Sequence, residues 1–386
     1  MNEFMKTYRL KITTLTPVHI GTSSDLEPTE YVIYSENEEA DNVICPECRH
    51  QNSSKDDLCG NCGCPLPKLK KEAEPVKGKS FLYTFTPAQL SQALSSADKA
   101  QLLKVAKNGT TAELKNFFKG KASAISKFAT KRAIVSPSIE KKYQEEKTEN
   151  RLFIEKQISD SVTGSPYIPG SSLKGAIRTA LMSKRNESVQ INRSRFIKIK
   201  GAGKKVEKQL YQYDKVASDP FKALKLCDAL PKETCLTHIY DLHRETKKND
   251  IPGTAEVIPQ NTLFLSSLSL MKETKPINFD ETIETIRNAC NDFYWDVFCS
   301  EIKRKWGKVV ESLMHVVENR KNCPNTFIIN IGKNSGAESK TIKNLRMIEN
   351  RKTHTLMEHS ETYWMICDKD VSLPFGWCVV EYEEVK

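Results

Sequence analysis

Apolar and polar residues alternate in short stretches along much of the chain, and a period of two predicts half-buried β-strands. The strands predicted on this basis lie at residues 8–15, 80–85, 153–158, 235–243, 254–271, 326–331 and 375–382. Strands are thus expected from one end of the chain to the other.

Two longer segments have helical spacing instead. Apolar residues recur at steps of three and four over residues 280–321, with Gly307 as a candidate kink. A second helical segment spans 86–131 and begins with Thr86 as N-cap and Pro87 in the first turn. Strands and helices follow one another irregularly, which favours an α+β fold over a regular parallel βαβ series.

Composition narrows the possible partners and the compartment. The length of 386 residues predicts two or three domains, and 59 Lys and Arg against 49 Asp and Glu suit a polyanionic partner or simply a soluble surface. No apolar run approaches the ~20 residues of a membrane span, and the N-terminus does not have the pattern of a signal peptide. We therefore expect a cytoplasmic protein with no membrane partner.

Cysteine usage points to a metal site. The chain has 12 cysteines, of which one group is clustered and the others are scattered, as in reduced cytosolic proteins. Four members of the group have C-x2-C, ten-residue, C-x2-C spacing: Cys45, Cys48, Cys59 and Cys62. Four thiolates complete a tetrahedral shell and leave no open position, so the pattern predicts a structural Zn2+ in a small zinc ribbon at 43–66, with Cys64 as an alternative to Cys62. Metal binding would supply folding energy to a segment that has no core of its own.

The segment 167–178 is the strongest candidate for anion binding. A short apolar piece ends at Pro169, a glycine and two serines follow, and helical spacing then begins. The pattern predicts a tight turn into a helix that Ser171 or Ser172 caps, with Lys174 and Arg178 beside its free N–H groups. An ordinary capped helix with solvated charges is the alternative. The candidate phosphate-binding residues are Gly170, Ser171, Ser172, Lys174, Gly175 and Arg178.

Residues 184–213 form a second basic segment. Residues 184–208 hold nine Lys and Arg against two Asp and Glu, and 195–200 alternate in polarity. We interpret this segment as a projecting basic β-hairpin or arm that binds single-stranded RNA, since cations interleaved with aromatics can track a backbone while bases stack. A solvated loop is the alternative. The candidate residues are Arg195, Lys198, Lys200, Lys204 and Lys205.

His19 and Gly21 follow a proline turn near the first strand. Both are candidates for RNA contact. His19 is also a candidate for acid–base chemistry, and a structural hydrogen bond is the alternative interpretation of His19.

Several blocks together resemble RAMP proteins of type III-A CRISPR systems. They lie at residues 15–22, 26–33, 167–178, 219–228 and 374–377, and the similarity runs from about residue 8 to 380. The closest resemblance is to the subunit that caps the crRNA 3′ end in Csm effector complexes, although Cmr-type RAMP modules share the element at 170–175. The resemblance implies two ferredoxin-like (RRM-like) RAMP domains, at 1–160 and 161–386, with the zinc ribbon inserted in the first.

The resemblance also implies a function. It indicates a non-catalytic, crRNA-binding subunit that caps the guide RNA 3′ end and supports crRNA 3′ maturation and complex assembly in antiviral defence. Its partners would be crRNA and the backbone RAMP subunits, with target RNA and recruited host nucleases as further candidates. The alternatives are a metal-independent endoribonuclease that uses His19 or His238 as general base, a Cmr-type RAMP subunit, or a protein in which the zinc ribbon is the main docking element.

Overall fold

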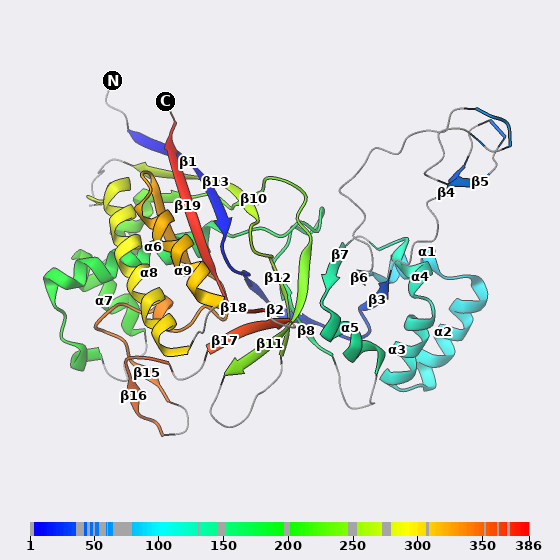
Figure 1. The fold of residues 1–386 in the computed structure, drawn as a ribbon. Coiled ribbons are helices and arrows are strands. Elements are labelled where there is room, and N and C mark those ends of the chain that lie inside the picture. Colours follow the sequence, from blue (N-terminus) through cyan, green and yellow to red (C-terminus); the bar gives the residue numbers. More distant parts are fainter. Residues whose placement is uncertain are drawn as a thin grey trace. The chain divides into compact units, whose positions relative to one another are not determined.

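The computed structural model divides the chain into two compact units, Met1–Glu27 with Arg151–Lys386, and Pro28–Asn150 (Figure 1). The residues that the structure describes are 4–35, 42–44, 47–48, 51–53, 59, 61–64, 79–129, 131–145, 152–196, 201–245, 253–271, 279–305, 309–350, 353–360, 363–368 and 371–385. The units differ from the expected division at residue 160, because the strand at 154–157 pairs within the larger unit. The two RAMP domains at 1–160 and 161–386 stay a prediction.

An antiparallel sheet is built around β1 in the larger unit. Strand β1 pairs with β13 on one side and β19 on the other, β14 continues beyond β19, and β9 and β10 both pair with β13. The strands are β1 (Met5–Thr14), β9 (Leu224–Leu226), β10 (Leu230–Pro231), β13 (Leu263–Met271), β14 (Thr326–Asn330) and β19 (Trp377–Glu384). Alternation along β1 places Tyr8, Leu10 and Ile12 in the core, as the period-two pattern predicted.

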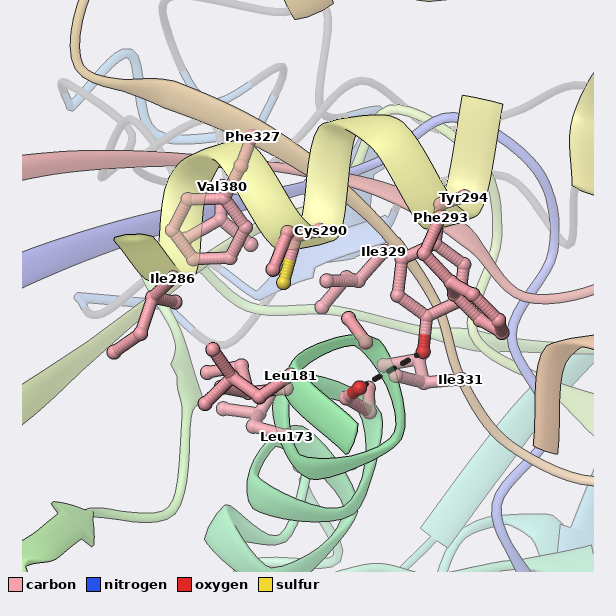
Figure 2. Packing of buried hydrophobic residues seen from close by; sticks show 14 of the residues in the cluster. Leu173, Leu181, Ile286, Cys290, Phe293, Tyr294, Phe327, Ile329, Ile331 and Val380 are labelled. Atoms are coloured by element: carbon pink, nitrogen blue, oxygen red, sulfur yellow. Dashed lines mark hydrogen bonds between the residues drawn. The ribbon is translucent and has the colours of Figure 1, made fainter. Parts of the chain in front are cut away.

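Three helices cover one face of this sheet: α6 (Gly170–Val189), α8 (Ile283–Lys305) and α9 (Val309–Asn322). Helix α7 (Ala202–Tyr211) packs against α6. Figure 2 shows Leu181 of α6 and Cys290 of α8 in the same buried cluster as Phe327 and Val380 of the sheet. The predicted helical pattern over 280–321 is thus two helices, and Gly307 lies outside the described residues.

A second sheet of the larger unit has the order β2, β8, β12, β11, β17, β18. Its strands are β2 (Gly21–Leu26), β8 (Ile154–Gln157), β11 (Thr237–Glu245), β12 (Gly253–Val257), β17 (Tyr363–Asp368) and β18 (Val371–Pro374). Only β8 and β12 run parallel within this set. A short hairpin of β15 (Ile348–Glu349) and β16 (Leu356–Met357) and the 3-10 turns η1 (Arg193–Phe196), η2 (Val216–Ser218), η3 (Pro220–Ala223) and η4 (Glu338–Lys340) complete the unit.

The smaller unit is a three-stranded antiparallel sheet with short helices. Strand β6 (Ser80–Thr84) lies between β3 (Tyr31–Ser35) and β7 (Lys131–Val135). The helices are α1 (Pro87–Ala93), α2 (Ser96–Asn108), α3 (Thr111–Gly120), α4 (Ala122–Ser126) and α5 (Pro137–Gln144), and β4 (Asn42–Ile44) pairs with β5 (Gln51–Ser53). Thr86 caps α1 and Pro87 starts it, as predicted.

The predicted mixture of helices and mainly antiparallel strands is confirmed. The finer assignment of two ferredoxin-like domains stays a prediction. None of the helices in the described ranges has both the length and the apolar character of a membrane span.

The contact between α6 and α8 generates a prediction. The buried Tyr294 hydroxyl donates a hydrogen bond of 3.1 Å to the Ala176 carbonyl oxygen. We expect Tyr294→Phe to lower the free energy of unfolding by about 1 kcal/mol, because one buried hydrogen bond is lost. Denaturant unfolding followed by tryptophan fluorescence measures this, since all four tryptophans belong to residues 151–386. Tyr167→Phe is the control, and an equal effect of both variants would contradict the assignment.

Candidate nucleic-acid interface

The start of α6 is held by the segment that follows η3. The helix begins at Gly170, whose N–H donates a 2.7 Å hydrogen bond to Asp228 Oδ1. A Cβ at Gly170 would lie 2.4 Å from the Leu226 carbonyl oxygen, so only glycine fits this close approach. The prediction that Ser171 or Ser172 caps the helix is wrong: both lie inside the first turn, the N-cap residue is Pro169, and Asp228 accepts from the first N–H.

One face of the first two turns is open. Ser171 and Gly175 are exposed, and a Cβ at Gly175 would meet no heavy atom within 4 Å. Ser171 and Gly175 are four residues apart, so they lie on the same side of the helix. This small, polar face is where a ligand backbone can approach α6 closely.

Lys174 is directed into the protein. Its Nζ donates a 2.8 Å hydrogen bond to the Leu224 carbonyl oxygen, and the side chain is half-buried. Burial lowers the pKa of Lys174, and the nearby charges of Arg178 and Lys225 lower it further. The predicted phosphate contact of Lys174 would therefore compete with an existing structural contact.

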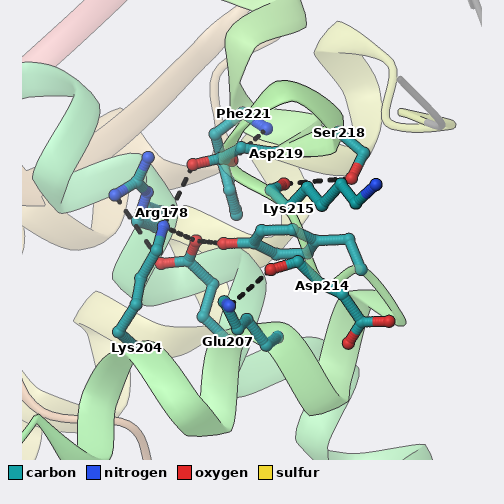
Figure 3. Close-up of polar contacts among 10 residues, drawn as sticks. Arg178, Lys204, Glu207, Asp214, Lys215, Ser218, Asp219 and Phe221 are labelled. Atoms are coloured by element: carbon teal, nitrogen blue, oxygen red, sulfur yellow. Dashed lines mark hydrogen bonds and ion pairs between the residues drawn. The ribbon is translucent and has the colours of Figure 1, made fainter. Parts of the chain in front are cut away.

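Arg178 and Lys204 belong to an internal charge cluster (Figure 3). Arg178 lies over the Phe221 ring at 4.6 Å and its Nη1 is 3.6 Å from Glu207 Oε2. Lys204 Nζ is 2.7 Å from Glu207 Oε1 and 3.0 Å from Asp219 Oδ2. These two predicted RNA-binding cations are thus already paired with buried or nearly buried carboxylates.

Tyr213 completes this cluster. Its hydroxyl donates to Glu207, and burial, with the Glu207 hydrogen bond next, raises the pKa of Tyr213 to about 12. Through these contacts the cluster connects α7 to Asp219, which precedes η3, and fixes the side chains of Arg178 and Lys204.

The predicted basic β-hairpin at 184–213 is wrong for the residues that the structure describes. Helix α6 continues to Val189, η1 follows, and α7 occupies Ala202–Tyr211. Val206 and Leu210 are buried at helical spacing, so packing against the core favours a helix over residues 202–211.

The individual candidates of this segment have different outcomes. Arg195 and Lys205 are exposed, and Lys198 and Lys200 lie outside the described residues. The aromatic residues of this segment are buried in the core: Phe196, Tyr211 and Tyr213 are 8%, 7% and 6% exposed. RNA bases therefore cannot stack on them.

His19 is a fully buried residue. Its Nδ1 is 2.7 Å from the Glu256 carbonyl oxygen, and its Nε2 is 3.3 Å from Glu155 Oε2. The structure therefore supports the structural reading of His19 and does not support direct contact of its side chain with RNA. Gly21, two residues on, is exposed.

A glycine loop packs on His19. The Lys333 N–H donates a 2.7 Å hydrogen bond to the His19 carbonyl oxygen, and Lys333 Nζ is 2.8 Å from Glu155 Oε1. Gly332 has a φ of +89°, and a Cβ there would lie 2.4 Å from the His19 carbonyl oxygen. His19 and then Lys333 hold the pKa of Glu155 below its ordinary value, against the effect of burial.

Several positioning residues were not found from the sequence. Asp228, Glu207, Glu155 and Lys333 each act across a large separation along the chain. The block at 219–228 gave a signal for Asp228 through the resemblance, but it did not show which of its members contact α6.

Three of the four predicted zinc ligands lie together. Cys48, Cys59 and Cys62 place their sulfur atoms within 4.8 Å of one another, and Cys48 Sγ is 3.6 Å from Cys59 Sγ. Two sulfurs of a tetrahedral zinc site are about 3.8 Å apart for Zn–S bonds of about 2.3 Å, so this spacing fits a shared metal ion. Cys64 is not part of this group of described residues, which favours Cys62, and Cys45 lies outside them.

Comparison with known proteins defines the class. The RAMP superfamily pattern matches residues 11–336, more than half of the chain, and the chain therefore belongs to the RAMP superfamily. Within that class it is similar to Csm5. It is 29% identical over 194 residues to the CRISPR system Cms protein Csm5 of Methanocaldococcus jannaschii, which is 46% of each protein. It is 32% identical over 143 residues to Csm5 of Streptococcus thermophilus, covering 34% of this chain and 38% of the relative.

The matched segments span less than half the length of these curated relatives. Solved structures show the same fold over nearly the whole chain. A chain in the cryo-EM structure of a Csm–crRNA–target RNA ternary complex of a type III-A CRISPR-Cas system has a TM-score of 0.59 at 18% identity, over 97% of this chain and 100% of that one. The crystal structure of T. onnurineus Csm5 has a TM-score of 0.56 at 16% identity, over 96% and 99%. The resemblance to type III-A RAMP proteins is confirmed.

The two glycines of α6 give opposite predictions. Gly170→Ala should lower the free energy of unfolding by about 1–3 kcal/mol, because the Cβ meets backbone that cannot move away easily. Gly175→Ala should raise it by about 0.5–1 kcal/mol, because the site is open and alanine favours a helix. Tryptophan-detected denaturation compares the two variants. A loss of stability in Gly175→Ala would show that this position is not open.

Proposed function

We propose that the protein is a non-catalytic crRNA-binding subunit of a type III-A Csm effector complex. In this role it caps the 3′ end of the guide RNA, contacts the backbone RAMP subunits in a cytoplasmic ribonucleoprotein, and supports crRNA 3′ maturation and assembly in antiviral defence. Membership of the RAMP superfamily and the similarity to Csm5 support this proposal and favour a Csm over a Cmr complex.

The open face of α6 is the observation that carries the proposal. Within the family motif, Gly170, Lys174 and Arg178 all make contacts that hold the fold. Ser171 and Gly175 are exposed to solvent, and there is free space around Gly175. A sugar-phosphate backbone can therefore approach α6 at this face, where the Ser171 hydroxyl can donate to a phosphate oxygen.

The surrounding charge suits the same ligand. Lys225 is exposed and lies close enough to Lys174 to lower its pKa, and Lys222 is exposed on η3. Mobile surface lysines next to a small-residue face can neutralise phosphates without reading bases. Binding of this kind is independent of sequence, as a cap on guide RNAs with different spacers requires. Lys205 and Arg195 are exposed and stay candidates for contact with the RNA backbone.

A second contact is proposed at Gly21 and the glycine loop. Gly21 is exposed, and Lys333 is exposed apart from its ion pair with Glu155. In this arrangement His19 is a positioning residue that holds the loop and Gly21 in register. Target RNA and recruited host nucleases are further proposed partners.

Two features support a non-catalytic role. His19 has no exposed surface for proton transfer to RNA, and its Nδ1 is occupied by the Glu256 carbonyl oxygen. His238, the other candidate base, has its Nδ1 3.1 Å from the Tyr240 hydroxyl. A general base has to reach the proton that it abstracts, and the fully buried imidazole of His19 cannot do so.

The cysteine group is proposed to hold a structural Zn2+. Cys45, Cys48, Cys59 and Cys62 would supply four thiolates, and the fixed tetrahedron would stabilise the segment at 43–66. The metal would supply folding energy and no chemistry on RNA.

RNA binding by the α6 face is tested with a single-stranded oligonucleotide. We expect the logarithm of the association constant to fall linearly with the logarithm of salt concentration, because phosphate contacts release counterions. Gly175→Glu should weaken binding about tenfold for unrelated sequences alike, since a carboxylate at the open face repels the backbone. Fluorescence anisotropy measures both effects.

Gln260→Glu adds the same charge at an exposed turn and serves as the control. Normal binding by Gly175→Glu, or a loss limited to one sequence, would contradict the α6 assignment. The bound RNA should stay intact; cleavage that His19→Ala or His238→Ala abolishes would instead favour the endoribonuclease alternative.

Zinc content gives an independent prediction. Elemental analysis of purified protein should find one zinc per chain, and Cys59→Ser should remove it because three thiolates hold the ion poorly. Chelation should make residues 43–66 sensitive to protease while tryptophan fluorescence stays unchanged. Cys323→Ser, outside the group, should keep the metal. Wild-type protein without zinc would refute the site.

A further inference from the structure

The helical segment of the smaller unit has an excess of basic over acidic residues. Residues 86–132 contain nine Lys and Arg against two Asp and Glu. This excess was not apparent from the chain-wide balance, because the net charge of +10 is spread over 386 residues. The excess makes this segment a candidate surface for a polyanion.

Both carboxylates of this segment serve the fold. Asp98 accepts from Ser95 at the start of α2 and is 2.7 Å from Lys121 Nζ. Glu113 accepts a 2.6 Å hydrogen bond from the Thr110 N–H at the start of α3. Asp98 and Glu113 thus interact with helix N-termini and with Lys121, and they leave most of the basic residues of the segment without a carboxylate from this segment.

Some of the basic residues also have structural partners. Lys119 donates to the carbonyl oxygens of Tyr143 and Gln144, and Arg132 lies 5.1 Å from the centre of the Phe81 ring. Lys121 holds Asp98. The fold therefore already holds these three cations.

The three lysines of α2 share one face. Lys99, Lys104 and Lys107 are exposed, and within the described part of the chain none of them has an ion pair or a hydrogen bond. At about 100° per residue they lie within an arc of about 140°, with Leu103 between them. Leu103 is 61% exposed and α2 has no buried residue, so this face is open to solvent among the described residues of its unit.

The spacing of these lysines suits a phosphate backbone. A rise of about 1.5 Å per residue places Lys99 and Lys107 about 12 Å apart along the helix axis, with Lys104 between them. Long, flexible lysine side chains at such intervals can follow successive phosphates. A membrane-surface helix needs several large apolar residues on one side, and this face has only Leu103.

We propose that the α2 face of Lys99, Lys104 and Lys107 is a second, sequence-independent binding surface for a nucleic-acid sugar-phosphate backbone. The ligand is RNA in so far as the proposed function holds, and this inference rests on that function. The surface extends RNA contact to the smaller unit, separately from the α6 face.

A triple variant tests the surface. Lys99→Gln, Lys104→Gln and Lys107→Gln together should weaken binding of single-stranded RNA at least tenfold at low salt. The slope of log K against log salt should fall by about 2, because each lost phosphate contact on a single strand contributes about 0.7. The control triple, Lys11→Gln, Lys141→Gln and Lys232→Gln, removes the same charge from exposed positions elsewhere and should change neither quantity much.

Lysine footprinting gives a second readout that needs no variant. RNA should protect Lys99, Lys104 and Lys107 from acetylation in the wild-type protein, while Lys141 stays reactive. An absence of protection, or equal losses in the two triple variants, would overturn the inference.

Additional experiments distinguish RNA from other ligands, and the α2 surface from the proposed function as a whole. A single-stranded DNA of the same sequence should lose affinity in the triple variant to a similar degree, whereas a loss for DNA alone would overturn RNA as the ligand. Loss of binding to phosphatidylserine vesicles with normal RNA binding would assign the face to a membrane instead. If Gly175→Glu loses RNA and the α2 triple does not, only this inference fails; if wild type binds no RNA, the proposed function fails.

Discussion

The larger unit depends on the close approach of Gly170 to the backbone of residues 226–227. No side chain fits there, because a Cβ would lie 2.4 Å from the Leu226 carbonyl oxygen. That approach lets Asp228 bind the first N–H of α6 and brings the Leu224 carbonyl within reach of Lys174. The helix, the segment after η3 and the edge strands of the sheet are thereby fixed together.

This constraint changes how the family motif has to be understood. The two cations of the motif already make contacts within the protein. Arg178 stacks on Phe221 and pairs with Glu207, and Lys174 is half-buried. Charges that are already paired inside the protein give little to a ligand, because moving them would leave carboxylates buried without a partner. The motif can contact RNA through the exposed face of Ser171 and Gly175. The positive charge for phosphate binding would then be supplied by exposed lysines nearby, such as Lys222 and Lys225.

The sequence predicted features whose cause is local. Alternation located β1, and the Thr86 and Pro87 signals located the start of α1, because caps and periodicity involve neighbouring residues. The cysteine spacing likewise predicted that Cys48, Cys59 and Cys62 lie close together. The serine cap and the β-hairpin at 184–213 were predicted wrongly, because Asp228 and the core that buries Val206 are distant in sequence. The burial of His19 against Glu155 and Glu256 has the same kind of cause.

The chain uses its charges in opposite ways in its two units. At α6 the carboxylates are buried and take up the basic residues, as Glu207 takes up Arg178 and Lys204. In the helical segment of the smaller unit the carboxylates are few and are taken up by helix N-termini, so lysines such as Lys104 stay in solvent. The total charge of a protein therefore does not locate its polyanion surface. The surface is located by asking, for each cation, whether a carboxylate, a carbonyl or an aromatic ring of the fold already occupies it.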